Sequence, residues 1–120
     1  MQNENVVIWH NPHCSKSRQA LKLLEDHGVS PRVVRYLDAP PDAQELGRVL
    51  TALGLEPRQL MRTNEVIYKD LGLAEATLDR SQLIAAMVAN PRLIERPVVL
   101  VGNRAVVGRP PEKVVDLLES

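Results

Sequence analysis

The distribution of β-rich apolar runs constrains the fold of this chain more than any other feature. Such runs occur only towards the two ends, at residues 6–9, 32–37 and 97–107, with a long stretch from about 42 to 93 between them. The first two runs flank a helical pattern over residues 15–27, so the chain begins strand–helix–strand. That order implies two parallel strands joined by a right-handed crossover.

The middle stretch has the pattern of helices. Apolar side chains recur at helical spacing in two places, first at Leu46, Val49, Leu50 and Leu53, before a stop at Gly54, and then at Leu83, Ile84, Met87 and Val88. Between them, Asn64 is a suitable N-cap for a short helix from Glu65 to about Leu71. We therefore expect a helical insertion over about residues 42–93.

After the insertion the chain returns to strands. Residues 97–101 are apolar, the pair 102–103 favours a turn, and residues 104–107 complete a hairpin before a last helix. The order βαβ, helices, ββα predicts an α/β protein with a thioredoxin-like arrangement: a four-stranded mixed sheet with helices packed on it. We expect one domain over residues 1–120, with the helical insertion in its middle.

Composition excludes several classes of protein. The chain has 120 residues, with 15 Lys+Arg and 15 Asp+Glu, so it lacks the basic excess of a dedicated nucleic-acid binder. No apolar run is long enough for a transmembrane helix, and we expect no membrane partner. A single cysteine forms no internal disulfide, and three histidines without ligand spacing predict no metal site. We expect a cytoplasmic protein, where a lone thiol stays reduced, and a monomer.

The lone cysteine, Cys14, is the strongest functional candidate. It lies where a predicted strand has ended and a predicted helix begins, so unpaired N–H groups and the positive end of the helix dipole face it. His10, His13, Lys16 and Arg18 lie within four residues of it. These surroundings lower a cysteine pKa from about 8.5 and also suit an oxyanion. The pattern indicates a nucleophile for an anionic substrate; the alternative is a structural buried cysteine, against which the loop position and basic neighbours argue.

Two neighbours of Cys14 have open roles. Ser17 occupies the position of the second sulfur of a Cys-x-x-Cys motif, so it cannot resolve a disulfide. It either donates a hydrogen bond to the thiolate or is a plain helix-surface serine. His10 either stabilises the thiolate as an imidazolium or packs the loop. Redox chemistry at Cys14 therefore needs another thiol from solution.

Three arginines precede or follow predicted elements. Arg62 comes before a helix, Arg96 before a strand and Arg109 after the hairpin. Arginine matches tetrahedral oxyanions bidentately. The loop before the third strand faces the loop after the first, which places Arg96 near Cys14, whereas periodicity does not place the other two. In thioredoxin-like folds a proline at the position of Pro97 is typically cis.

The segment from His10 to Arg18 resembles the His-Asn-Pro-x-Cys-x-x-Ser-Arg signature of the glutaredoxin-linked arsenate reductases. Further resemblances follow in the family's order over residues 60–64, 71–74, 95–99 and 108–112, so that they cover essentially the whole chain. Ser15-Lys16, where plasmid-type members have Gly-Thr, and Thr63, where they often have Lys, resemble a chromosomal member.

This resemblance implies a site and a reaction. Cys14 would attack arsenate and His10 would support its thiolate. The other implied site residues are the oxyanion-binding Arg62, Arg96 and Arg109 and the supporting Asn11, Ser17 and Pro97. Glutathione would then attack the arsenic as co-substrate, glutaredoxin would supply the remaining reducing equivalent, and arsenite would be released. No bound cofactor is implied.

Two other functions remain open. A thiol transferase acting on glutathione adducts would need Cys14 but not all three arginines. Spx-type transcription regulators, which bind RNA polymerase, have the same fold and a similar N-terminal motif, but they usually carry a Cys-x-x-Cys switch that Ser17 removes here.

Overall fold

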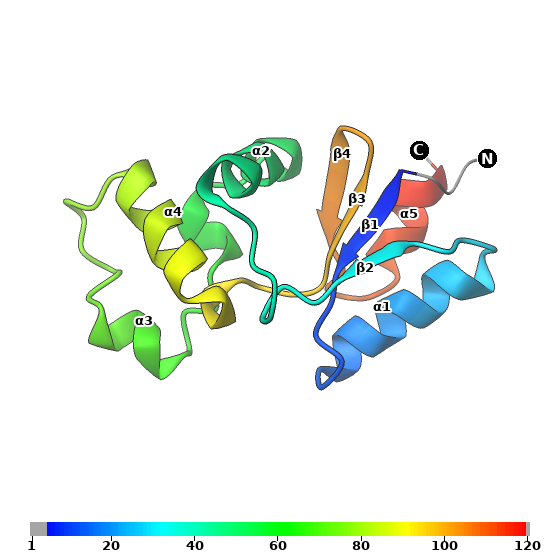
Figure 1. Ribbon diagram of the computed structural model, residues 1–120, viewed down its shortest axis with the longest axis horizontal. Helices are drawn as coiled ribbons and strands as arrows, with labels where there is room; N and C mark the ends of the chain where they lie inside the picture. Colours follow the sequence, from blue (N-terminus) through cyan, green and yellow to red (C-terminus); the bar gives the residue numbers. More distant parts are fainter. Residues whose placement is uncertain (1–4, 120) are drawn as a thin grey trace. The chain divides into compact units, whose positions relative to one another are not determined.

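The computed structural model describes residues 5–119, which form two compact units (Figure 1). The first unit joins the chain up to Ala39 with the chain from Arg96 onward, and the second is Pro40–Glu95. The elements are β1 (Val6–Trp9), α1 (Ser15–Asp26), β2 (Arg32–Val34), α2 (Ala43–Leu53), η1 (Pro57–Leu60), α3 (Val66–Asp70), α4 (Arg80–Ala89), η2 (Pro91–Leu93), β3 (Val98–Val101), β4 (Arg104–Val107) and α5 (Lys113–Glu119).

The sheet belongs entirely to the first unit and has the strand order β2-β1-β3-β4. β1 and β2 are parallel, with Ile8 opposite Val33, and α1 is their crossover. β3 runs antiparallel to both β1 and β4, with Val99 opposite Ile8 and Val106. The predicted four-stranded mixed sheet with α/β architecture is therefore confirmed.

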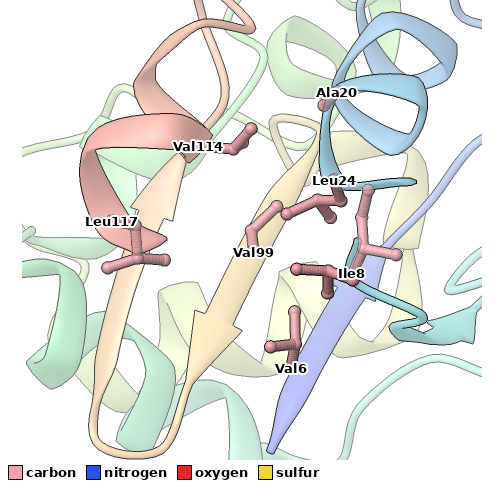
Figure 2. Close-up of a cluster of buried hydrophobic side chains, with 8 residues drawn as sticks. Val6, Ile8, Ala20, Leu24, Val99, Val114 and Leu117 are labelled. Carbon is pink, nitrogen blue, oxygen red and sulfur yellow. The ribbon is translucent and has the colours of Figure 1, made fainter. Parts of the chain in front are cut away.

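One hydrophobic cluster packs the helices α1 and α5 against this sheet (Figure 2). Ile8 and Val99 come from adjacent strands, Leu24 from α1 and Val114 from α5, and all four side chains are fully buried. Each such burial stabilises the fold by about 1.5–3 kcal/mol. Because this packing holds α1 against the sheet, it also fixes where the N-terminus of α1 lies.

Strand β2 is shorter than predicted. It ends at Val34, whose carbonyl oxygen accepts a hydrogen bond from the His10 N–H at 2.8 Å. The chain then turns, since the Asp38 N–H donates to the Arg35 carbonyl oxygen at 2.9 Å. The apolar pattern up to residue 37 predicted a longer strand because Tyr36 is buried, but Tyr36 lies in this turn and not in a strand.

In the second unit, α2 has the predicted helix signals. The Asp42 carboxylate accepts the Glu45 N–H at 2.8 Å as the N-cap, and Gly54 ends the helix in the left-handed region at φ 69°. The apolar face packs inward, with Leu46 and Leu50 fully buried. The second unit, residues 40–95, spans nearly the same residues as the predicted insertion.

Two features of the second unit differ from the predicted pattern, one in backbone pairing and one at the start of α3. Residues 60–62 and 93–95 pair side by side, through an antiparallel bridge between Met61 and Ile94 and two backbone hydrogen bonds of 2.7 Å. The N-cap of α3 is Glu65 rather than Asn64, and the Glu65 side chain does not cap the helix. Its carboxylate binds Arg62 instead. Within residues 5–119 no helix has both the length and the hydropathy needed to cross a membrane.

Candidate active site

The loop between β1 and α1 presents Cys14 as the N-cap residue of α1. Asn11 shapes this loop: its carbonyl oxygen accepts the Cys14 N–H at 3.0 Å, and its side-chain oxygen accepts the His13 N–H at 2.9 Å. The second contact is an Asx turn, the local bond by which asparagine replaces a backbone turn. Cys14 has extended dihedral angles, so its side chain lies over the first turn of the helix, where backbone N–H groups are unpaired within the helix.

Donors from three segments surround the Cys14 sulfur. The backbone N–H groups of Ser17 and Lys16 and the guanidinium group of Arg96 favour the charged form of this sulfur and lower its pKa. Nη2 of Arg109 lies 3.7 Å from Sγ, and Nε of the same arginine donates to the Arg96 carbonyl oxygen at 2.7 Å. The predicted proximity of Arg96 to Cys14 is confirmed, and the structure also brings Arg109 there, which periodicity could not do.

These donors decide the ionisation of Cys14. Burial by itself raises the pKa of the thiol, but the Ser17 N–H, the Arg96 guanidinium and the Lys16 N–H together outweigh it and hold the pKa below its usual value. A larger fraction of Cys14 is therefore thiolate at neutral pH than in a free cysteine, and the thiolate is the nucleophilic form.

The expectation that Cys14 avoids burial is wrong. The residue is only 9% exposed, because it lies in the first turn of a helix packed on the sheet and has arginine side chains over its sulfur. Sequence neighbours suggested an open loop, whereas the covering groups come from residues 96 and 109, far along the chain. This burial does not make the cysteine inert, because the groups that cover it are cationic.

Ser17 and His10 form one buried pair. Oγ of Ser17 accepts the Asn11 N–H at 3.0 Å and lies 2.6 Å from Nδ1 of His10. Ser17 is fully buried, so the helix-surface alternative is wrong. Among the described contacts its hydroxyl binds His10 and Asn11, and it is the Ser17 backbone N–H that lowers the pKa of Cys14.

His10 is held in its neutral form. Burial lowers its pKa from the ordinary value, and the positive charges of Arg35 and Arg18 lower it further. Of the two alternatives for His10, the structure favours loop packing over an imidazolium beside the thiolate. The neutral Nδ1 is a suitable acceptor for the Ser17 hydroxyl proton.

Pro97 and Gly108 support the two arginines. The Arg96–Pro97 bond is cis, as predicted for this position, and the Arg109–Pro110 bond is cis as well. The Pro97 carbonyl oxygen accepts the Gly108 N–H at 2.8 Å. A Cβ atom at Gly108 would lie 2.9 Å from Cγ of Pro97, so this close approach requires glycine. This role of Gly108 was not predicted, although a glycine directly before Arg109 could have indicated a close backbone approach.

Arg62 lies in the second unit, where two carboxylates hold it. Its Nη1 binds Oε2 of Glu65, and its Nε lies 3.7 Å from Oε1 of Glu95. Neither glutamate was predicted to be a site residue. Glu65 was readable as an i,i+3 partner of Arg62, but Glu95 comes from a distant segment. Within residues 5–119, no three His, Cys, Asp or Glu side chains gather as metal ligands.

The first unit therefore defines a class of protein: a thioredoxin-like α/β fold whose helix N-terminus holds a lone, partly ionised cysteine beside two arginines. The chain belongs to the ArsC family, whose model matches residues 9–117.

Relatives in sequence and in structure agree with this family. The chain is 47% identical to an arsenate reductase of Neisseria meningitidis over 94% of this chain and 97% of the relative. It is 49% identical to the uncharacterized protein YfgD of Escherichia coli (strain K12) over 96% and 98%. Among solved structures, a putative arsenate reductase from Yersinia pestis has a TM-score of 0.90 and 50% identity, over 92% of this chain and 98% of that one. An arsenate reductase from Vibrio cholerae has a TM-score of 0.91 at 49% identity, over 92% and 95%. The thioredoxin-like fold prediction is confirmed.

Proposed function

We propose that this protein reduces arsenate to arsenite through a covalent adduct on Cys14. The observation that carries the proposal is the Cys14 sulfur itself, which lies 3.7 Å from Nη2 of Arg109 and whose pKa is lowered by the Ser17 N–H, by Arg96 and by the Lys16 N–H. A nucleophile and oxyanion donors in one place suit attack on an anion. Relatives named arsenate reductases, 44–47% identical over nearly the whole chain, support arsenate as that anion.

The first step forms a bond between sulfur and arsenic. The Cys14 thiolate attacks arsenic(V), one arsenic–hydroxyl bond breaks, and the hydroxide takes a proton from solvent to leave as water. Arsenic stays in its oxidised state in this step. Arg96 and Arg109 stabilise the oxygens on which negative charge develops, because a guanidinium donates two parallel hydrogen bonds to such groups. Arg62 is the third oxyanion residue of this proposal.

Reduction needs two electrons, and the chain has one cysteine. Glutathione attacks the arsenic of the adduct and displaces a second hydroxyl group, which leaves as water. A glutaredoxin thiolate then attacks the glutathione sulfur, and the bond between that sulfur and arsenic breaks with its electron pair left on arsenic. The two external thiols leave as a mixed disulfide, so they supply both electrons and arsenic becomes arsenic(III). Hydrolysis of the remaining sulfur–arsenic bond releases arsenite and restores Cys14.

The residues around Cys14 have distinct roles in this scheme. Asn11 folds the loop, and the Ser17–His10 pair fixes the start of the helix, so that the N–H groups of residues 16 and 17 stay directed at the sulfur. Neutral His10 thus supports the thiolate through geometry and not through charge. Pro97 and Gly108 keep the Arg96 carbonyl oxygen where Arg109 binds it.

Arsenite production from arsenate by the purified protein tests the proposal. We expect turnover only when glutathione and glutaredoxin are both present, and none from Cys14→Ser, which is nearly isosteric and retains the fold. Equal arsenite production by Cys14→Ser, or none by the folded wild-type protein, contradicts the proposal. A wild-type protein that instead releases glutathione from mixed disulfides, with Arg62→Ala, Arg96→Ala and Arg109→Ala unimpaired, would favour a thiol transferase.

A further inference from the structure

Arg62 differs from a free surface arginine because one of its nitrogens donates a hydrogen bond to a carboxylate and a second forms an ion pair with another carboxylate. Nη1 binds the Glu65 carboxylate and Nε lies 3.7 Å from Glu95 Oε1. Among the residues that the structure describes, these two carboxylates are the polar partners of the guanidinium in this unit, and they leave the two N–H groups of Nη2 for another acceptor. An arginine has five N–H donors in a rigid plane, so fixing two nitrogens also fixes the direction of the third.

The backbone fixes both carboxylates relative to Arg62. The Glu65 N–H donates to the Arg62 carbonyl oxygen at 3.1 Å, which closes a tight turn. Arg62 donates its own N–H to the Leu93 carbonyl oxygen at 2.7 Å, and the Glu95 N–H donates to the Leu60 carbonyl oxygen at 2.7 Å. The two segments that carry Arg62 and Glu95 are thus paired strand-like, and neither carboxylate depends on a flexible loop for its position.

This cluster is also more sheltered than an ordinary surface ion pair. The side chains of Arg62, Glu65 and Glu95 are 28%, 19% and 28% exposed. The pair Arg48–Glu45 on α2 has the same i,i+3 spacing, but its side chains are 52% and 42% exposed. Water therefore screens the Arg62 cluster less, and its geometry is held more firmly.

Arg92 adds a second cation. Its Nη2 lies 3.6 Å from Oε1 of Glu65, the carboxylate oxygen that Arg62 does not bind. Glu65 consequently shares its charge between two arginines. The net charge of the four groups is zero, so the cluster does not present an excess of negative charge to an approaching anion.

We propose that Glu65 and Glu95 are positioning residues that fix the guanidinium plane of Arg62, so that its Nη2 is preorganised to bind an oxyanion. The proposal rests on the proposed function, in which Arg62 is an oxyanion ligand. A free arginine loses side-chain entropy when it binds an anion, and holding the guanidinium in advance removes much of that loss. The carboxylates stay bound to Nη1 and Nε while the oxyanion binds Nη2.

The test compares arsenate kinetics of Glu65→Gln and Glu95→Gln with Glu45→Gln as the matched control. Glutamine keeps the shape of the side chain and removes its charge. We expect the KM for arsenate to rise about three- to tenfold in each cluster variant, with kcat within about twofold, and no change in Glu45→Gln. In an Arg62→Gln background, Glu65→Gln should have no further effect, because its partner is gone. If Glu65 only stabilised the fold, Glu65→Gln would still have its effect in the Arg62→Gln background.

Two results overturn the inference. A KM that is unchanged or lower in both variants means that the carboxylates do not direct Arg62, and a lower value means that they compete with the anion. An equal effect of Glu65→Gln with and without Arg62 means that Glu65 acts elsewhere.

Calorimetric binding of phosphate and arsenate to the same proteins separates this inference from the proposed function. A wild-type protein that binds both anions without reducing arsenate contradicts the reaction, and the loss of affinity in Glu65→Gln then still tests the inference. Unchanged affinity in Arg62→Gln removes Arg62 from the anion site and the inference with it, while the chemistry of Cys14 stands or fails on the arsenite assay.

Discussion

Arg109 in the first unit and Arg62 in the second are held in opposite ways. Arg109 donates its Nε to a neutral acceptor, the Arg96 carbonyl oxygen, and its Nη2 lies 3.7 Å from the Cys14 sulfur. Arg62 is fixed by the carboxylates of Glu65 and Glu95. Both guanidinium groups have a defined direction, but Nε of Arg109 binds a dipole, whereas Arg62 binds charged carboxylates.

The difference separates two uses of arginine. The carbonyl oxygen that binds Nε of Arg109 carries no net charge, so this contact does not neutralise the guanidinium; it belongs to Arg96, which lowers the pKa of the Cys14 thiol. The carboxylates that hold Arg62 offset part of its positive charge and fix the direction of its guanidinium group. We therefore expect changes around Cys14 to alter the thiol pKa, and changes around Arg62 to alter anion affinity with little effect on the thiol.

The largest effect should come from Arg96→Lys. Lysine keeps the charge but replaces the planar fork by a single ammonium group, so transition-state contacts to the oxyanion are lost. We expect kcat/KM for arsenate to fall about tenfold to a hundredfold. The pKa of Cys14, measured from the pH dependence of alkylation, should rise less in Arg96→Lys than in Arg96→Ala. Unaltered kinetics in Arg96→Lys would remove Arg96 from the site.

Ser17→Ala should have the next largest effect, on stability. The buried hydroxyl serves both the Asn11 N–H and His10 Nδ1, and alanine leaves these two groups without it. We expect a loss of about 2–3 kcal/mol in the free energy of unfolding, measured in urea. Ser15→Ala in the same helical turn is the control, because Ser15 is exposed; it should change stability by less than about 0.5 kcal/mol. Equal losses in both variants would mean that the Ser17 hydroxyl is unimportant.

Gly108→Ala and Gly47→Ala should change stability in opposite directions. At Gly108 the new methyl would lie 2.9 Å from Pro97 Cγ and 3.3 Å from Val114 Cγ1, so we expect a loss of about 1–2 kcal/mol. At Gly47, inside α2, it would lie 3.9 Å from Ile84 Cδ1, an ordinary contact. Alanine there should stabilise by about 0.5–1 kcal/mol. A destabilised Gly47→Ala would show that α2 cannot accept the methyl group.

The sequence predicted what depends on local pattern. Gly54 ends α2 as expected, and α1 begins directly after Cys14, because caps and helical periodicity act over a few residues. The resemblance to arsenate reductases led to the family that the comparisons confirm.

What the sequence did not predict depends on contacts between distant segments. Cys14 is buried because Arg96 and Arg109, more than eighty residues away, cover it. Glu95 meets Arg62 only because two short segments pair, and no periodicity marks that pairing. Asn64 was the better N-cap by residue type, but the chain placed Glu65 there. Local preference was overridden by the tertiary arrangement in each case.

The smallest expected effect is a pH dependence of stability that Cys14→Ser removes. The folded-state pKa of Cys14 is below its usual value, while the unfolded chain titrates near about 8.5. Between these two values the unfolded state binds more protons, so the free energy of unfolding rises with pH. The contribution is complete above the unfolded-state pKa and is lost as the pH falls through the folded-state pKa.

Urea unfolding of both proteins from about pH 5 to 9 measures this contribution, since the difference between wild type and Cys14→Ser should increase with pH across that window. His10 acts at the acidic end of this pH range. Burial, Arg35 and Arg18 lower its pKa, so the fold loses stability as the pH falls below the ordinary pKa of histidine. Both proteins contain His10, so its effect largely cancels in the difference. A difference that is constant or falls with pH would mean that Arg96 and the N–H groups of Ser17 and Lys16 do not stabilise a thiolate at Cys14.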